Sequence, residues 1–89
     1  PIVLVEDRTY PASWLIPSRQ DRNNTSRAAF KAAYEKMLDE GIENLFYVDG
    51  DSLLAADRDD TTDGSHPSDL GFFNQANAIE PALRAALNV

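Results

Sequence analysis

The sequence predicts an α/β fold built on a parallel sheet. Two short apolar runs, Ile2–Val5 and Asn44–Val48, have the continuous hydrophobic composition of strands that are buried on both faces. A helical pattern lies between the two runs, and a second one follows the later run after a polar stretch. A strand, a helix and a second strand in this order form a right-handed parallel unit. The predicted order is therefore strand, helix, strand, long loop, helix.

The first helix is predicted within the segment between the strands. Three consecutive residues are suited to cap its N-terminus, namely Asn23, Asn24 and Thr25. An apolar stripe at helical spacing follows, with Phe30 and Tyr34 beside it. The members of this stripe are Ala28, Ala29, Ala32, Ala33, Met37 and Leu38. We expect the alanine-rich stripe to lie in the core, and Gly41 is well placed as the C-cap.

The chain between the second strand and the last helix is polar and rich in turn residues. Asp49-Gly50-Asp51 ends the strand at a turn, and Ser52–Ala56 is suited to a short helical turn. The last helix is predicted to begin near Ser68 or Asp69, where an acidic side chain is favoured by the helix dipole. Pro81 falls inside its pattern and is expected to kink or restart the helix. Its apolar positions, of which the phenylalanine pair is expected in the core, are Phe72, Phe73, Ala76, Ile79, Leu83 and Leu87.

Composition excludes several classes of function. The net charge is −7, from 15 acidic and 8 basic residues, which argues against nucleic acid and anionic membrane surfaces as partners. No apolar run approaches the roughly 20 residues of a membrane span. With no cysteine and one histidine, the chain has few ligands for zinc. The aspartates of the later loop lack the alternating spacing and closing glutamate of a calcium loop, so we interpret the region as solvated and expect no metal. They are Asp49, Asp51, Asp57, Asp59, Asp60, Asp63 and Asp69.

The candidate site is the segment from Asp63 to Gly71, which holds the sole histidine. Asp63, three residues before His66, is close enough to accept a hydrogen bond from one ring nitrogen. Such a bond fixes the tautomer and leaves the other nitrogen free as a base. In parallel sheets, sites gather at the carboxyl ends of the strands, and this loop follows the second strand. The alternative is that Asp63 caps a turn and His66 only packs before Pro67.

Two residues after the first strand are candidates for the border of a substrate pocket. Arg8 and Trp14 follow that strand, at the same predicted edge of the sheet as His66. The alternatives are that Arg8 pairs with a nearby acid and that Trp14 covers the core.

The sequence Asp63-Gly64-Ser65-His66-Pro67, followed by Ser68-Asp69-Leu70-Gly71-Phe72 at the start of the last helix, resembles the C-terminal signature of the SGNH, or GDSL-type, hydrolases. The order of elements also looks like the last third of that fold. The resemblance implies the C-terminal part of a three-layer α/β/α sandwich with a parallel, flavodoxin-like sheet. It implies hydrolysis of acyl or acetyl esters, often on carbohydrates, without a cofactor. His66 would be the general base, and Asp63 its orienting partner.

The upstream blocks of that family are not in this sequence. Its nucleophilic serine lies in a Gly-Asp-Ser motif early in the domain, and its oxyanion-hole glycine and asparagine come from two further blocks. Gly50-Asp51-Ser52 spells the first motif but follows the wrong strand, so we interpret it as coincidence. The chain also begins with a strand at its first residues, and two parallel strands make a poor domain. We therefore expect residues 1–89 to be the C-terminal segment of one hydrolase domain, dependent on the upstream part and inactive alone.

Two alternatives to the esterase remain open at this point. One is a noncatalytic α/β binding or interaction module in which the Asp-x-x-His pattern is structural. The other is a segment that completes the site of a partner chain.

Overall fold

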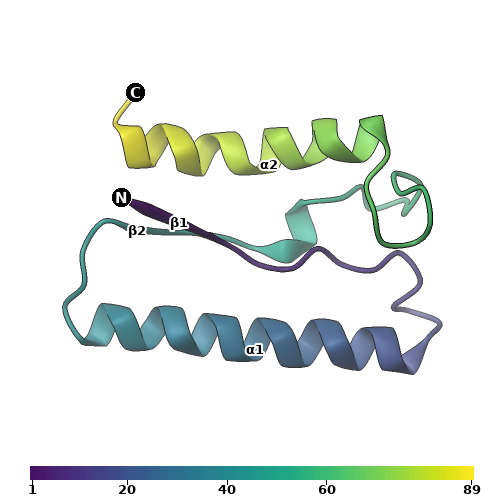
Figure 1. The fold of residues 1–89 in the computed structure, drawn as a ribbon, viewed down its shortest axis with the longest axis horizontal. Coiled ribbons are helices and arrows are strands. Elements are labelled where there is room, and N and C mark those ends of the chain that lie inside the picture. Colours follow the sequence, from purple (N-terminus) through teal and green to yellow (C-terminus); the bar gives the residue numbers. More distant parts are fainter.

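The computed structural model describes residues 1–89 and consists of a two-stranded sheet between two helices. β1 (Ile2–Val5) and β2 (Leu45–Val48) pair in parallel, with Ile2 opposite Leu45 and Val5 opposite Val48. α1 (Pro17–Asp39) and α2 (Asp69–Leu87) lie on opposite faces of this sheet (Figure 1). The predicted α/β fold with a parallel sheet in three layers is confirmed. No helix is both long enough and apolar enough to cross a membrane.

α1 begins earlier than the sequence predicts. Its first residue is Pro17, and Ile16 precedes it in extended conformation without a side-chain cap. Proline suits the first helical position because its fixed φ is already helical and the N–H that it lacks would have no partner there. The predicted cap at Asn23–Thr25 is therefore wrong, since these residues lie inside the helix. The predicted end is close, because Gly41 follows the last turn with a left-handed φ of 81°.

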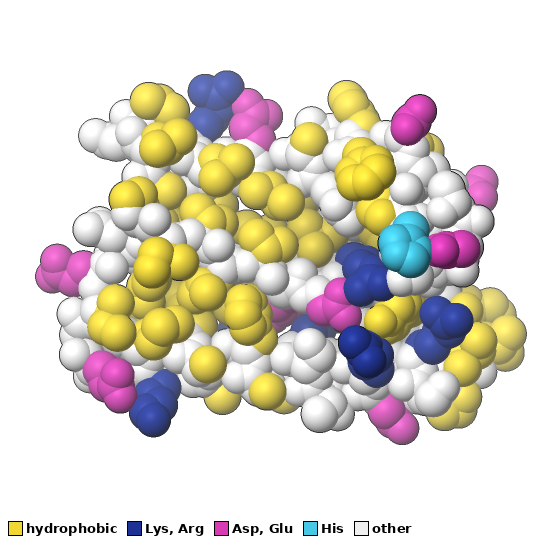
Figure 2. Space-filling view, in the orientation of Figure 1, with side chains coloured by type: hydrophobic (Ala, Val, Ile, Leu, Met, Phe, Trp, Pro, Cys, Tyr) yellow, Lys and Arg dark blue, Asp and Glu magenta, His cyan; other side chains and the backbone are white.

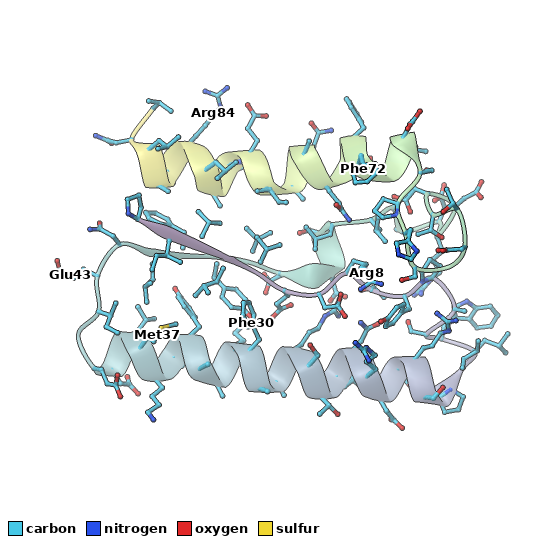
Figure 3. The ribbon with its side chains drawn as sticks, viewed as in Figure 1. Arg8, Phe30, Met37, Glu43, Phe72 and Arg84 are labelled. Atoms are coloured by element: carbon cyan, nitrogen blue, oxygen red, sulfur yellow. The ribbon has the colours of Figure 1, made fainter.

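The face of α1 that meets the sheet differs from the predicted stripe. Phe30, Tyr34 and Met37 are partly buried and point from α1 toward the strands, as Figure 3 shows for Phe30 and Met37. The Phe30 and Tyr34 rings lie 5.9 and 4.8 Å from the Tyr47 ring. The four alanines of the stripe are exposed, which contradicts their expected place in the core. Larger side chains bury more apolar area, and that favours the observed rotation of the helix.

α2 confirms its predicted start and corrects one further expectation. Ser68 is its N-cap, and Asp69 lies in the first turn. The helix continues through Pro81 without an interruption. Phe72 and Phe73 are 59% and 63% exposed, so the expectation that this pair lies in the core is wrong. Gly71 is the residue that faces the protein, and successive residues turn by about 100° round a helix, so the two phenylalanines point away.

The most buried part of the molecule is the carboxyl end of the sheet. The buried apolar side chains there are Tyr10, Val48, Leu53 and Leu54. A 3₁₀ helix, η1 (Gly50–Ser52), begins one residue after β2, so the short helical turn lies earlier than the predicted Ser52–Ala56. The turn after β2 is therefore packed against the segment that leaves β1.

Candidate functional site

The loop that carries Asp63 and His66 lies at the same sheet edge as the segment after β1, as predicted. Arg8 Nε donates to the Ser65 carbonyl oxygen at 3.1 Å, and its Nη2 donates to Ser65 Oγ. The loop is closed by a bridge between Thr61 and Pro67, and within it the Thr62 N–H donates to the His66 carbonyl at 2.8 Å. Residues far apart in the sequence therefore meet at the carboxyl ends of the strands.

Asp63 holds His66 through both of its carboxylate oxygens. Oδ2 lies 2.6 Å from His66 Nδ1, and Oδ1 accepts the backbone N–H groups of His66 and Ser65 at 2.7 and 2.9 Å. The His66 backbone N–H, and then the ring, hold the pKa of the Asp63 carboxyl down at about 2. An ionised carboxylate only accepts hydrogen bonds, so the proton of a neutral ring belongs on Nδ1. Nε2 is then an unprotonated base.

The pair is open to solvent. The side chains of His66 and Asp63 are 79% and 51% exposed. In the space-filling view the histidine projects from the surface beside an acidic side chain, with basic side chains next to it (Figure 2). His66 Nε2 makes no hydrogen bond with any residue of the chain, so a group from outside these residues has access to it.

No serine in the 89 residues is hydrogen-bonded to the His66 ring. Ser52 Oγ donates to the Asp49 carbonyl at 2.9 Å, within η1. Asp51 accepts from Thr9 Oγ1 and Arg27 Nη1, each at 2.8 Å, and these bonds lower the pKa of its carboxyl. The Gly50-Asp51-Ser52 sequence therefore serves a structural turn here, which agrees with its interpretation as coincidence.

The two residues predicted to border a pocket differ in their surroundings. Arg8 pairs with Asp7 and also contacts Ser65, so the alternative of a nearby acid applies to it. Trp14 is 68% exposed and lies in the turn between β1 and α1, so it does not cover the core. A role for either side chain at the border of a substrate pocket stays a prediction.

Two buried acids, Glu6 and Asp60, accept hydrogen bonds from the segments at this edge of the sheet. The sequence does not predict this role for either of them. Glu6 accepts from the Gly50 N–H at 2.8 Å and from Tyr47 Oη, and lies 3.6 Å from Arg27. Burial, and then the Glu6 bond, raise the pKa of the Tyr47 hydroxyl.

Asp60 is the second buried acid, and it lies where the sequence suggested a wholly solvated acidic loop. It is 0% exposed, and its Oδ2 accepts from the Ala55 N–H at 2.7 Å and from Asn74 Nδ2 at 2.8 Å. Its carbonyl accepts the Ser68 N–H at 2.9 Å. Asp60 therefore ties the loop to the start of α2, and nothing in its local sequence separates it from the neighbouring exposed aspartates.

A cavity of about 210 Å³ has Thr9, Asp51, Arg58 and Asp60 in its lining. Neither Asp63 nor His66 lines it. No group of three or more His, Asp or Glu side chains is placed to hold a metal ion.

Comparison with known proteins gives two matches. The GDSL-like Lipase/Acylhydrolase family model matches residues 1–84. The crystal structure of a Bacteroides ovatus ATCC 8483 protein assigned as a GDSL-like lipase superposes with a TM-score of 0.90 at 24% identity. That match covers 99% of this chain and 26% of the other, so the chain spans about a quarter of the length of that protein, and the likeness shows the fold. Among curated proteins, none matches this chain significantly.

Proposed function

This chain belongs to the GDSL-like lipase/acylhydrolase family, whose model matches residues 1–84 of 89, and from this membership we propose that Asp63 and His66 are two members of a Ser-His-Asp site for ester hydrolysis. The observation that carries the proposal is the 2.6 Å contact between Asp63 Oδ2 and His66 Nδ1, which leaves Nε2 unpaired. The nucleophile and the oxyanion donors belong to residues outside these 89.

The proposed reaction is acyl transfer in two steps. His66 Nε2 takes the proton of the serine hydroxyl as its oxygen attacks the ester carbonyl, and then gives that proton to the departing alcohol. In the second step Nε2 takes a proton from the water that attacks the acyl-enzyme, and it returns that proton to the serine oxygen as the bond between this oxygen and the acyl carbon breaks and the acid leaves. Asp63 keeps the ring oriented and stabilises the imidazolium that forms in each step. The proposed substrates are acyl or acetyl esters, including those carried on carbohydrates.

The exposure of Asp63 and His66 supports the proposal that the site needs a nucleophile from further residues. A general base that works on a serine must come within about 3 Å of the serine hydroxyl. His66 is 79% exposed, and no serine of this chain reaches its ring. The open face beside the ring is the place where a nucleophile from the rest of the domain would approach (Figure 2).

The test uses the protein in which these residues are joined to the rest of their domain. Hydrolysis of p-nitrophenyl acetate and labelling by a fluorophosphonate are measured for the unaltered protein, His66→Ala and Asp63→Asn. We expect each variant to lose kcat by about 10⁴-fold, as in other triads. Asp59→Asn, which alters an exposed acid of the same loop, is the matched control and should keep its activity.

The outcomes separate the alternatives. Full activity in His66→Ala would sink the proposal. A protein that takes no fluorophosphonate label and hydrolyses no ester would favour the binding module. A label on a second chain in a mixed assembly would favour the segment that completes a partner.

A further inference from the structure

We propose that Arg8 and Arg19 are positioning residues, which hold the backbone of Gly64 and Ser65 and thereby fix where Asp63 presents the His66 ring. This inference rests on the proposed function and adds the residues that orient its acid–base pair. We call Arg8, Arg19 and the ring of Tyr10 the arginine clamp.

Arg8 makes the closest contacts of the clamp. Its Nε donates to the Ser65 carbonyl at 3.1 Å, and its Nη2 donates to Ser65 Oγ, so one edge of the guanidinium group holds Ser65 at two points. The remaining nitrogen, Nη1, pairs with Asp7, which fixes the rotation of the group. A planar guanidinium with two parallel contacts restrains its target in direction as well as in distance. Arg8 points toward the loop in Figure 3.

Arg19 reaches the adjacent residue from α1. Its Nη1 donates to the Gly64 carbonyl at 3.4 Å. The guanidinium carbons of Arg8 and Arg19 lie 4.5 and 5.4 Å from the centroid of the Tyr10 ring. Cations at these distances from an aromatic ring are attracted by its electrons. The buried tyrosine therefore holds both arginines beside the loop.

The backbone that carries Arg8 and Tyr10 is hydrogen-bonded to α1. Asn23 in α1 is 3% exposed; its Oδ1 accepts the Tyr10 N–H at 3.0 Å, and its Nδ2 donates to the Arg8 carbonyl at 2.9 Å. A buried amide that satisfies both a donor and an acceptor of one segment holds that segment in a single position. The backbone from Arg8 to Tyr10 therefore has a fixed position, from which the Arg8 side chain extends to the loop.

The loop of residues 62–66 depends on the arginine clamp because it has few other contacts with the part of the chain that includes β1 and α1. The contacts of Arg8 and Arg19 are the only hydrogen bonds between residues 62–66 and the first fifty residues. Gly64 has a left-handed φ of 83°, with nothing within 4 Å of the place where a Cβ would lie. His66 itself is too exposed for packing to fix its ring. The position of the base is therefore set through the loop backbone.

The experiment compares Arg8→Ala and Arg19→Ala with the unaltered protein, again with the rest of the domain present. Displacement of a catalytic group by about 1 Å costs up to about 10²-fold in rate, so we expect kcat to fall about 10- to 100-fold while KM changes less than about twofold. Ethylguanidinium at millimolar concentration should restore part of the kcat of Arg8→Ala. Arg84→Ala is the matched control, because Arg84 lies toward the far end of α2 and its side chain forms hydrogen bonds and an ion pair only with Glu80 (Figure 3).

The readouts distinguish positioning from general support of the fold. A variant that is merely less stable would lose activity without rescue, since guanidinium compounds do not stabilise a fold, and that result would overturn the proposal. Unchanged kcat in both variants would also overturn it. The proposed function fails separately, if His66→Ala stays active. In that case hydrogen exchange of the Ser65 and His66 amides tests whether the arginine clamp holds the loop. The proposal requires these amides to exchange faster in Arg8→Ala than in Arg84→Ala, and equal rates would overturn it.

Discussion

Gly50 is the position at which adding a single methyl group is expected to cost the most stability. It follows β2, and its N–H donates to Glu6 at 2.8 Å. A Cβ at this place would lie 2.6 and 2.9 Å from the two nearest guanidinium nitrogens of Arg27, and still closer to the Asp7 carbonyl oxygen. The carbonyl is backbone and cannot rotate away, so the two segments that leave β1 and β2 must move apart.

The expected magnitude follows from two contributions. Overpacking against fixed atoms costs about 3 kcal/mol at the upper end of its usual range. Separation of the segments also weakens the bond from Gly50 to the buried Glu6 carboxylate, which is worth about 1.5 kcal/mol. We therefore expect Gly50→Ala to lower the free energy of unfolding by about 4 kcal/mol.

The assay is urea unfolding followed by far-ultraviolet circular dichroism, with Gly41→Ala as the matched control. Gly41 has a left-handed φ of 81° and nothing within 4 Å of its absent Cβ. Alanine there carries only the backbone cost of about 1 kcal/mol. Equal losses in the two variants would refute the argument, because they would mean that the close approach at Gly50 is not needed in the folded protein.

Three further predictions concern the same end of the sheet. Asn23→Ala should lower the free energy of unfolding by about 2 kcal/mol, since it leaves a donor and an acceptor of the segment after β1 unpaired, whereas the exposed Asn24→Ala should change it little in the same urea experiment. Ser68→Ala removes the N-cap of α2 and should cost about 1 kcal/mol in thermal unfolding; no change would mean that another group caps the helix. The pKa of Asp63 is lowered from 3.8 to about 2, so the ionised carboxylate stabilises its loop above about pH 4 and loses this effect as the pH falls toward 2. Carbon-13 resonances of the carboxyl groups measure this titration, and a midpoint near 4 for Asp63 would contradict the hydrogen bonds described.

The predictions that the structure confirms depend on short-range sequence patterns. The two strands, the second helix with its N-cap, and the turn at Gly41 each depend on residues within a few positions of one another. The contact between Asp63 and His66 also spans only three residues, so its geometry was accessible from the sequence. The start of α1 at Pro17 differs from the predicted cap at Asn23–Thr25, because a helix that begins with proline after an extended residue shows no side-chain capping signal at its true start.

Burial was predicted less well, because it depends on which face of an element meets another element. The alanines of α1 and the phenylalanine pair of α2 have helical spacing, but this spacing does not say which face meets the sheet. The large side chains of α1 that meet the sheet set its rotation, and the close approach of Gly71 to Asp60 sets that of α2. Asp60 itself has the same local sequence character as the exposed Asp59, and only its contacts with Ala55 and Asn74 explain why it is buried.

The sequence by itself determined the order of elements, the parallel arrangement and the Asp63–His66 pair, because hydrophobic periodicity and short hydrogen bonds are local properties of the chain. Only the tertiary structure decided what surrounds that pair. Arg8 and Ser65 are 57 positions apart, and Arg19 and Gly64 are 45 apart. Contacts of this range form when the two strand ends are brought to one edge of the sheet, and no local pattern specifies which side chains will meet there.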